Sequence, residues 1–370
     1  MEFLPLLKKK NVNIRNPNID FLRVLGMFSI VVDHIIFHGR AMIKYSNYKE
    51  IKLLYIFSMW HVSSFGIVSG LVGNKTHKYS NLLYLWIIVV FYSIIFYLKY
   101  NDLIETSSYQ LLLGNIFPVI NNKYWYFTSY FGMYPFLCYI NSGNASLSQL
   151  EIKKSIYFMF GIFILWASLN KDSFAQHNGK SPFSLLIFYI IGAYIDKYIF
   201  YRQKTTYIKN LICLFCILVF IIISLITYII NTKQLYSKFC LNMKNIFKIE
   251  INSFPMIMQA YSLSIFICHI KLRKYISKFM TLIGPLTFDI YLIHENTYIR
   301  RKYIKNSFDN YPINLKKSYI IFLIYKRSIF IFVICIFIAY IRNIIFQITK
   351  VKFLCRNLEI IITRIINYLI

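Results

Sequence analysis

Charged residues are scarce in this chain. Of its 370 residues only 15% are charged, while 58% are hydrophobic. A soluble domain carries about 25% charged residues and could not keep so much apolar surface out of water. The composition therefore excludes an ordinary soluble protein. It predicts an all-α, polytopic bundle of membrane helices.

Acidic residues are the scarcest of the charged types. Lys and Arg number 42 against 14 Asp and Glu, which gives a net charge of +28. Such basicity can indicate a nucleic-acid partner. Here the basic residues lie in short runs between apolar segments, so we expect them to flank membrane helices and to meet anionic lipid headgroups. Membrane lipids are the predicted partners, and nucleic acid is not.

Two sequence signals are also missing. The segment from Met1 to Lys10 has no apolar core followed by a small-residue cleavage site, so we expect the first helix itself to direct insertion. The 7 cysteines form no regular framework. Cys213 and Cys216 make a Cys-x-x-Cys, but it lies inside an apolar helix, which favours core packing over metal or redox chemistry.

Apolar segments long enough to cross a bilayer, which takes roughly 20 residues, recur along the chain. About ten are predicted, at 19–38, 52–72, 81–99, 123–141, 154–170, 182–200, 208–230, 253–270, 281–299 and 326–348. We divide the chain into a tail at 1–17, a transmembrane domain at 18–348 and a second tail at 349–370. Residues 355–370 are too charged to cross and predict an amphipathic helix at the interface.

The orientation follows from the basic residues near the first helices. Most of them fall on one side if the N-terminus is cytosolic, although a cluster from Arg300 to Lys305 falls on the opposite side. The first helix usually dominates the choice, so both termini are expected in the cytosol.

Arg23 and His34 are the most informative pair. Both lie in the first apolar segment, where ionisable groups are costly and indicate a functional site. Their spacing is close to three whole turns, so both side chains should leave the helix on one face, roughly 16 Å apart along the axis.

A structural explanation stays open for both residues. His34 could be a buried histidine satisfied by Asp33 or by a backbone carbonyl. Asp20 could cap the helix start and pair with Arg23.

Other candidate residues follow along the chain. His61 lies in the second segment, where Gly66, Ser69 and Gly70 also favour close helix packing. Lys75 and Lys78 would add charge at the inner end of that segment. Trp125 belongs to an aromatic run typical of a membrane interface. Tyr291, His294 and Glu295 fall in the ninth segment, which also contains Asp289.

In this order the segments resemble the acyltransferase 3 family of membrane O-acyltransferases. Arg23, ten residues and His34 resemble its Arg-x10-His signature; His61 to Gly70, Trp125 to Pro135, Phe188 to Tyr194 and Gly284 to His294 resemble later segments. The resemblance covers about residues 18–348. Two positions depart from it: Lys75 and Lys78 replace an Arg-x-x-Arg and lose the bidentate fork, and Leu71 stands where many relatives have an aromatic residue.

The resemblance implies a ten-helix bundle that moves an acyl group, acetyl in the first instance, from acyl-CoA to a hydroxyl group of a glycan or lipid-linked sugar. On this basis His34 and Arg23 would be the catalytic residues, and Arg23, Lys75 and Lys78 would also bind the phosphates of acetyl-CoA. His34 would be the catalytic base or an acylated nucleophile, and the sequence does not choose between these roles. His61, Ser69, Trp125, Tyr291 and His294 would contact the substrate, and no metal is expected.

Two other classes of protein fit part of the pattern. Ionisable groups on two helices also suit a proton-coupled transporter, but the chain has no paired half-helices broken by Gly or Pro. A receptor or scaffold would leave Arg23 and His34 buried without a use.

Overall fold

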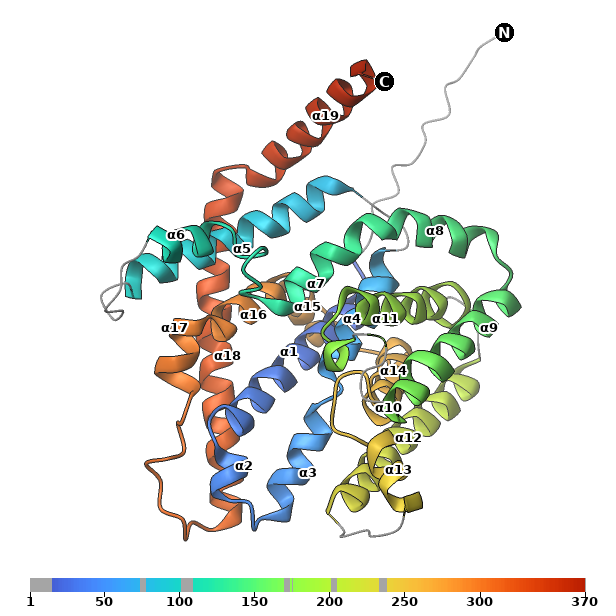
Figure 1. Cartoon of the computed structure of the whole chain (residues 1–370), viewed down its shortest axis with the longest axis vertical. Coiled ribbons are helices and arrows are strands. Elements are labelled where there is room, and N and C mark those ends of the chain that lie inside the picture. The colour runs from blue at the N-terminus through green and yellow to red at the C-terminus, as the bar shows by residue number, and fades with distance from the viewer. Residues whose placement is uncertain are drawn as a thin grey trace.

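The computed structural model describes residues 15–73, 78–100, 109–169, 174, 176–200, 205–232 and 238–369, and every regular element in those ranges is helical. The all-α prediction is confirmed (Figure 1). Helices suit a bilayer because they satisfy their backbone N–H and C=O groups internally.

The α-helices run in chain order from α1 to α19. They are α1 (Pro17–Phe37), α2 (Ala41–Lys44), α3 (Lys49–Ser58), α4 (His61–Gly73), α5 (Tyr79–Tyr100), α6 (Tyr109–Ile116), α7 (Trp125–Met133), α8 (Leu137–Ser146), α9 (Gln149–Phe160), α10 (Ala167–Leu169), α11 (Pro182–Tyr194), α12 (Thr206–Thr232), α13 (Lys238–Ile246), α14 (Phe254–His269), α15 (Lys274–Ile283), α16 (Thr287–Glu295), α17 (Thr297–Ile299), α18 (Lys317–Ile348) and α19 (Val351–Leu369). Short 3-10 or π turns join some of them, at Tyr134–Phe136, Gly161–Trp166, His177–Gly179, Ile195–Phe200, Gly284–Leu286 and Arg300–Ile304.

Within the described ranges, 7 helical stretches are long and apolar enough to cross a membrane. They are Lys49–Gly73, Tyr79–Tyr100, Gln149–Leu169, Pro182–Ile199, Thr206–Thr232, Lys274–Glu295 and Lys317–Ile348. The prediction of about ten spanning helices is therefore not confirmed.

Three of the predicted spans are not among these stretches, each for an identifiable reason. Helix α1 has the length, but Asp20, Arg23 and Asp33 interrupt its apolar character. The segment at 123–141 is divided between α7 and α8 by a tight turn that contains Pro135. Helix α14 has only 16 residues, fewer than a bilayer crossing requires.

Helix α1 occupies the centre of the bundle. It packs against α4, α14, α15, α16 and α18 (Figure 1). Leu22, Val31 and Ile35 on α1 are fully buried. Because so many elements pack against α1, its ionisable residues are surrounded by protein rather than lipid.

Glycine residues let α4 and α11 touch along their backbones. A Cβ atom at Gly70 would lie 2.0 Å from the Tyr189 carbonyl oxygen, and one at Gly192 would lie 2.0 Å from that of Ile67. At Gly66 it would lie 2.5 Å from Cβ of Phe188. The predicted packing role of Gly66 and Gly70 is confirmed.

Apolar side chains cover the outside of the bundle. Phe215 on α12 and Phe330 and Phe337 on α18 are among the large hydrophobic residues that remain exposed. Such a surface fits a lipid environment. On α12, Cys216 packs in the apolar core and Cys213 is half-buried, which agrees with the packing interpretation of this Cys-x-x-Cys.

The C-terminal tail forms a helix. Helix α19 follows α18 after Lys350, whose φ of 51° turns the chain. It packs against α5 (Figure 1). Many of its isoleucine and leucine side chains are exposed. Its position at a membrane interface, like the cytosolic placement of both termini, stays a prediction.

We expect Gly70→Ala to destabilise the protein by about 1–3 kcal/mol, because the added methyl group must push α4 away from α11. Gly143→Ala on α8 is the matched control, since nothing lies within 4 Å of its added Cβ. Replacing this helical glycine should leave the stability of the protein equal to that of wild type or slightly higher. Thermal unfolding in detergent measures both, and a Gly70→Ala protein at least as stable as wild type would contradict the packing.

Candidate active site

The start of α1 is fixed by its own sequence and by α14. The side chain of Asn16 caps the helix by accepting a hydrogen bond from the Asn18 backbone N–H at 3.0 Å, and Pro17 occupies the first turn. Asn18 Nδ2 donates to the carbonyl oxygens of Ile267 at 2.7 Å and Ile270 at 2.8 Å. The cap is therefore Asn16, not Asp20, because Asp20 is engaged elsewhere.

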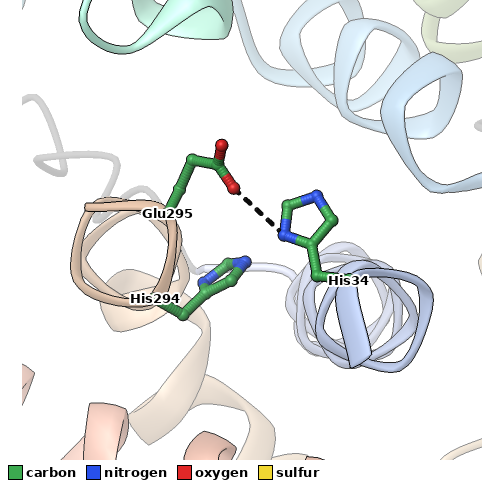
Figure 2. Close-up of side chains that lie close together, drawn as sticks. All are labelled: His34, His294 and Glu295. Carbon is green, nitrogen blue, oxygen red and sulfur yellow. Dashed lines mark ion pairs between the residues drawn. The ribbon is translucent and has the colours of Figure 1, made fainter. Parts of the chain in front are cut away.

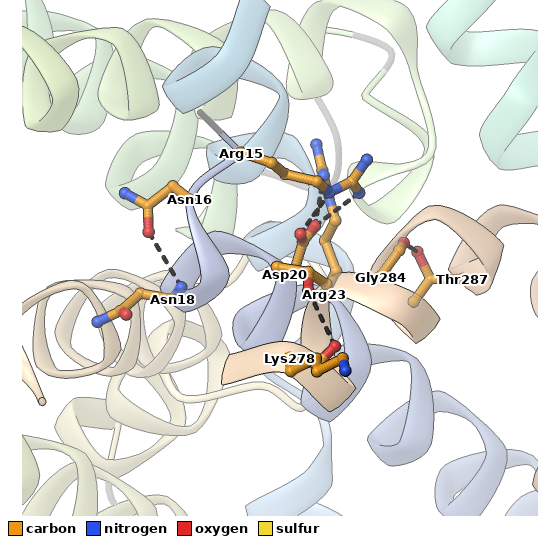
Figure 3. Close-up of polar contacts among 9 residues, drawn as sticks. Arg15, Asn16, Asn18, Asp20, Arg23, Lys278, Gly284 and Thr287 are labelled. Carbon is orange, nitrogen blue, oxygen red and sulfur yellow. Dashed lines mark hydrogen bonds and ion pairs between the residues drawn. The ribbon is translucent and has the colours of Figure 1, made fainter. Parts of the chain in front are cut away.

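Asp20 binds two arginines (Figure 3). Arg15 Nη2 donates to Oδ1 at 2.7 Å and Arg15 Nε donates to Oδ2, while Arg23 Nη1 donates to Oδ1 at 3.0 Å. The predicted Asp20–Arg23 pair is confirmed. Gly284 makes room for the carboxylate, since a Cβ there would lie 2.5 Å from Oδ1. One carboxylate thus gathers two guanidinium groups at one end of α1.

A cavity of about 360 Å³ extends from these arginines into the bundle. The residues predicted as functional that line it are Arg23, His34, His61, Ser69, Trp125 and Tyr291. Arg15, Tyr126 and Tyr130 also line it and were not among the predicted residues. Arg23 and His34 thus face one space, as their spacing predicts. Their roles stay predictions.

The walls of the cavity come from elements far apart in the sequence. Trp125 and Tyr126 begin α7, and the backbone N–H of Tyr126 donates to the Tyr291 hydroxyl on α16 at 3.3 Å. Lys180 Nζ lies 5.6 Å from the centre of the Trp125 ring. These aromatic side chains form an apolar lining around the few polar groups, which is typical of a small-molecule site.

His34 contacts Glu295 rather than Asp33. Nδ1 of His34 lies 3.1 Å from Oε2 of Glu295, within ion-pair distance but not aligned as a hydrogen bond (Figure 2). The other carboxylate oxygen of Glu295 accepts a hydrogen bond from Arg300. Asp33 lies 3.5 Å from Nε2 of His61. The structural interpretation that Asp33 satisfies His34 is therefore wrong.

Two more histidines surround His34. The ring of His294 lies 5.2 Å from it and that of His38 lies 5.0 Å from it, centre to centre. His294 is fully buried, and its Nδ1 contacts the Ile290 carbonyl oxygen at 2.5 Å. Its Nε2 has no hydrogen-bond partner within the described part of the chain. His294 thus packs against the catalytic candidate and does not line the cavity.

The same side chains also bring metal-ligand atoms together. A nitrogen from each of His34 and His294 and a Glu295 carboxylate oxygen all lie within 4.8 Å of one another. Two histidines and a carboxylate are a donor set that zinc accepts. The expectation that no metal takes part stays a prediction.

Lys78 and Asp289 do not line the cavity. Lys78 is exposed, and its backbone exchanges hydrogen bonds with the Tyr134 hydroxyl. Lys75 lies outside the described residues. Asp289 forms a buried ion pair with Arg342, whose Nε and Nη2 donate to its two carboxylate oxygens at 2.6 and 2.5 Å. This pair joins α16 to α18.

Glu295 and Arg15 are the functional candidates that sequence reasoning did not assign. The adjacency of Glu295 to His294 marked it as an ionisable group at membrane depth, but nothing in the sequence paired it with His34. Arg15 precedes the helix, so helical spacing could not place it beside Arg23.

Comparison with known proteins gives one match. The sequence model of the acyltransferase 3 family, described as an acyltransferase domain, matches residues 16–342, which is nearly the whole chain. No curated protein and no solved structure matches the chain.

Proposed function

The chain belongs to the acyltransferase 3 family, and we propose that it transfers an acyl group, acetyl in the first instance, from acyl-CoA to a hydroxyl group of a carbohydrate or related acceptor. Family membership and the apolar helices make it an integral-membrane acyltransferase. The donor, the acetyl group and the acceptor are the proposed parts.

One observation carries the proposal: a single cavity has guanidinium groups at one end and the imidazole of His34 at the other. The positions of Arg23 and His34 on α1 differ by roughly 16 Å along the axis. An extended pantetheine arm suits such a separation. Arg15 and Arg23 would hold phosphate groups of the donor by charge-assisted hydrogen bonds, and Lys75 and Lys78 are proposed to assist.

His34 would act through Nε2. With Nδ1 toward Glu295, the other ring nitrogen is free to take a proton, and it points away from α16 (Figure 2). His34 would remove the proton of the acceptor hydroxyl while the hydroxyl oxygen attacks the thioester carbonyl carbon. The carbon–sulfur bond then breaks, and the departing CoA thiolate takes the proton back from His34.

A two-step route uses the same nitrogen. Nε2 would attack the thioester carbonyl carbon, CoA would leave as the thiolate, and the acceptor hydroxyl would then displace the acyl group from Nε2. The proton of that hydroxyl passes to the released Nε2 and from there to the thiolate. In both routes Glu295 orients the ring and stabilises its positive charge, as a carboxylate does for a catalytic histidine in serine hydrolases.

The other predicted substrate residues keep proposed roles. Trp125 and Tyr291 would pack against the acyl arm or a sugar ring, and Ser69 and His61 would donate hydrogen bonds. His294 would act through His34, since it lies behind that ring.

His34→Ala should abolish transfer, a loss of about 10²-fold to 10⁴-fold or more, because it removes the proposed general base from the wall of the cavity. Membranes incubated with labelled acetyl-CoA, with the product identified by mass, measure it. His177→Ala at an exposed position is the control. Full activity of the His34→Ala protein would contradict the proposal. Substrate flux into liposomes without acyl-CoA would instead support the transporter alternative.

Glu295→Gln should lower kcat by about 10²-fold to 10⁴-fold while the KM for acetyl-CoA stays constant, because it removes the group that orients His34. Glu295→Asp should restore part of kcat. A purely structural role would instead reduce the amount of folded protein without this separation of kcat from KM, which size-exclusion chromatography and steady-state kinetics distinguish.

Arg23→Ala should weaken acetyl-CoA binding by about 10-fold to 100-fold, the value of a charge-assisted hydrogen bond. Asp20 keeps Arg15 as its partner, so the helix start should remain folded. Acetyl-pantetheine, which has no phosphate, should bind wild type and Arg23→Ala equally. The exposed Lys278→Ala is the control. An unchanged affinity for acetyl-CoA would exclude Arg23 from phosphate binding.

A further inference from the structure

A second cavity lies at the opposite end of α1 from Arg23. Its volume is about 560 Å³. The polar residues of its wall are His38, Arg40, Thr297, Arg300, Arg301, Lys305 and Asn306. We call it the basic cavity. The proposed transfer reaction assigns no role to it.

The basic cavity has more positive charge than its neighbours neutralise. Arg40 pairs with Asp309 at 3.0 Å, and Arg300 pairs with Glu295. The side chains of Arg301 and Lys305 have no ion-pair partner within the described ranges. Two uncommitted cations beside two paired arginines make a site for an anion, and guanidinium groups match the oxygen geometry of phosphate.

The wall is held in place by backbone contacts between distant segments. The Asn306 N–H donates to the His38 carbonyl oxygen at 3.0 Å, and the Phe308 N–H donates to that of Gly39 at 3.1 Å. Arg40 and Asn306 both have positive φ, of 66° and 58°. These contacts join the loop after α1 to the turn after Arg300–Ile304, so the cationic groups converge before any ligand binds.

The basic cavity is coupled to the catalytic candidate. The ring of His38, on its wall, lies 5.0 Å from the ring of His34. Glu295 contacts both Arg300 and Nδ1 of His34, the latter at 3.1 Å. A group bound there would lie on the other side of His34 from the cavity proposed for the donor.

The charge runs against the usual distribution in membrane proteins. In the orientation predicted from the first helix, the cluster from Arg300 to Lys305 faces away from the cytosol, where Lys and Arg are normally depleted. Cations that serve only as topology signals or lipid contacts would not need to converge on one cavity.

We infer that the basic cavity binds a phosphate or diphosphate group of the acceptor, next to the hydroxyl that receives the acyl group. This inference rests on the proposed acyl transfer and specifies its acceptor. The phosphate would hold the acceptor beside His38 and Arg300, with the acyl arm approaching His34 from the Arg23 end. A diphosphate-linked lipid sugar and a soluble sugar phosphate share this chemistry.

The test compares Arg301→Gln/Lys305→Gln with the control Lys302→Gln. Lys302 belongs to the same basic run, but its Nζ lies 5.4 Å from the Tyr100 ring centre and 5.6 Å from that of Tyr303, and it does not line the cavity. The purified full chain is placed in nanodiscs of neutral phosphatidylcholine. Binding of radiolabelled inorganic pyrophosphate is measured directly.

Wild type and Lys302→Gln should bind pyrophosphate, and the double variant should bind it at least about tenfold more weakly. Transfer of labelled acetyl is then compared for a polyprenyl diphosphate sugar, a sugar 1-phosphate and the free sugar. The double variant should show a raised KM for the phosphorylated acceptor that serves wild type, with an unchanged KM for acetyl-CoA. The phosphorylated acceptor that wild type uses, either the polyprenyl diphosphate sugar or the sugar 1-phosphate, identifies the source of the phosphate.

Equal pyrophosphate binding by wild type and the double variant would overturn the inference. So would efficient His34-dependent transfer to the free sugar that the double variant leaves intact, although acyl transfer itself would then stand. In a second set of nanodiscs that contains phosphatidylglycerol, binding of this lipid by Arg301 and Lys305 without competition from pyrophosphate would assign the cavity to lipid and also overturn the inference. Pyrophosphate binding without transfer from acetyl-CoA to any acceptor would instead overturn the proposed function.

Discussion

The Glu295 carboxylate is the group on which the described site depends. It contacts Nδ1 of His34 at 3.1 Å and pairs with Arg300, so one side chain on α16 connects the imidazole on α1 with the cations of the basic cavity. A carboxylate inside an apolar bundle is expensive unless it is paired. Pairing it with both groups offsets part of this cost and leaves Nε2 of His34 available. Without Glu295, His34 and Arg300 would have no common partner among the described residues.

The packing of α1 makes this arrangement possible. Its apolar side is buried against other helices, among them α4, α15 and α18, while Asp20, Arg23 and His34 face protein groups rather than lipid. At one end Asp20 neutralises part of the charge of two arginines, with Gly284 giving it space. Asp20 and Arg23 therefore each have a partner of opposite sign. The two cavities lie at opposite ends of this one helix.

Features that depend on local sequence were predicted correctly, whereas contacts between distant segments were not. The Arg23–His34 spacing placed both side chains on one cavity, because helical periodicity is a local property. The small residues of α4 were identified for the same reason. The partner of His34 was not identified from the sequence, because Asp33 is its neighbour in sequence but Glu295 is its neighbour in space. The predicted number of about ten spans is not confirmed among the described residues, since Pro135 and the charges of α1 limit how long each apolar helix remains continuous.

The sequence by itself determined the helical class, the membrane environment and the stripe of ionisable residues on the first helix, because composition and a period of 3.6 residues act over short distances. Only the tertiary structure decided which charges meet. The pairing of Arg15 with Asp20, of Glu295 with His34 and the convergence of Arg40 with Arg301 depend on how helices far apart in the chain cross. Those crossings follow from the simultaneous packing of many side chains, and no short segment contains that information.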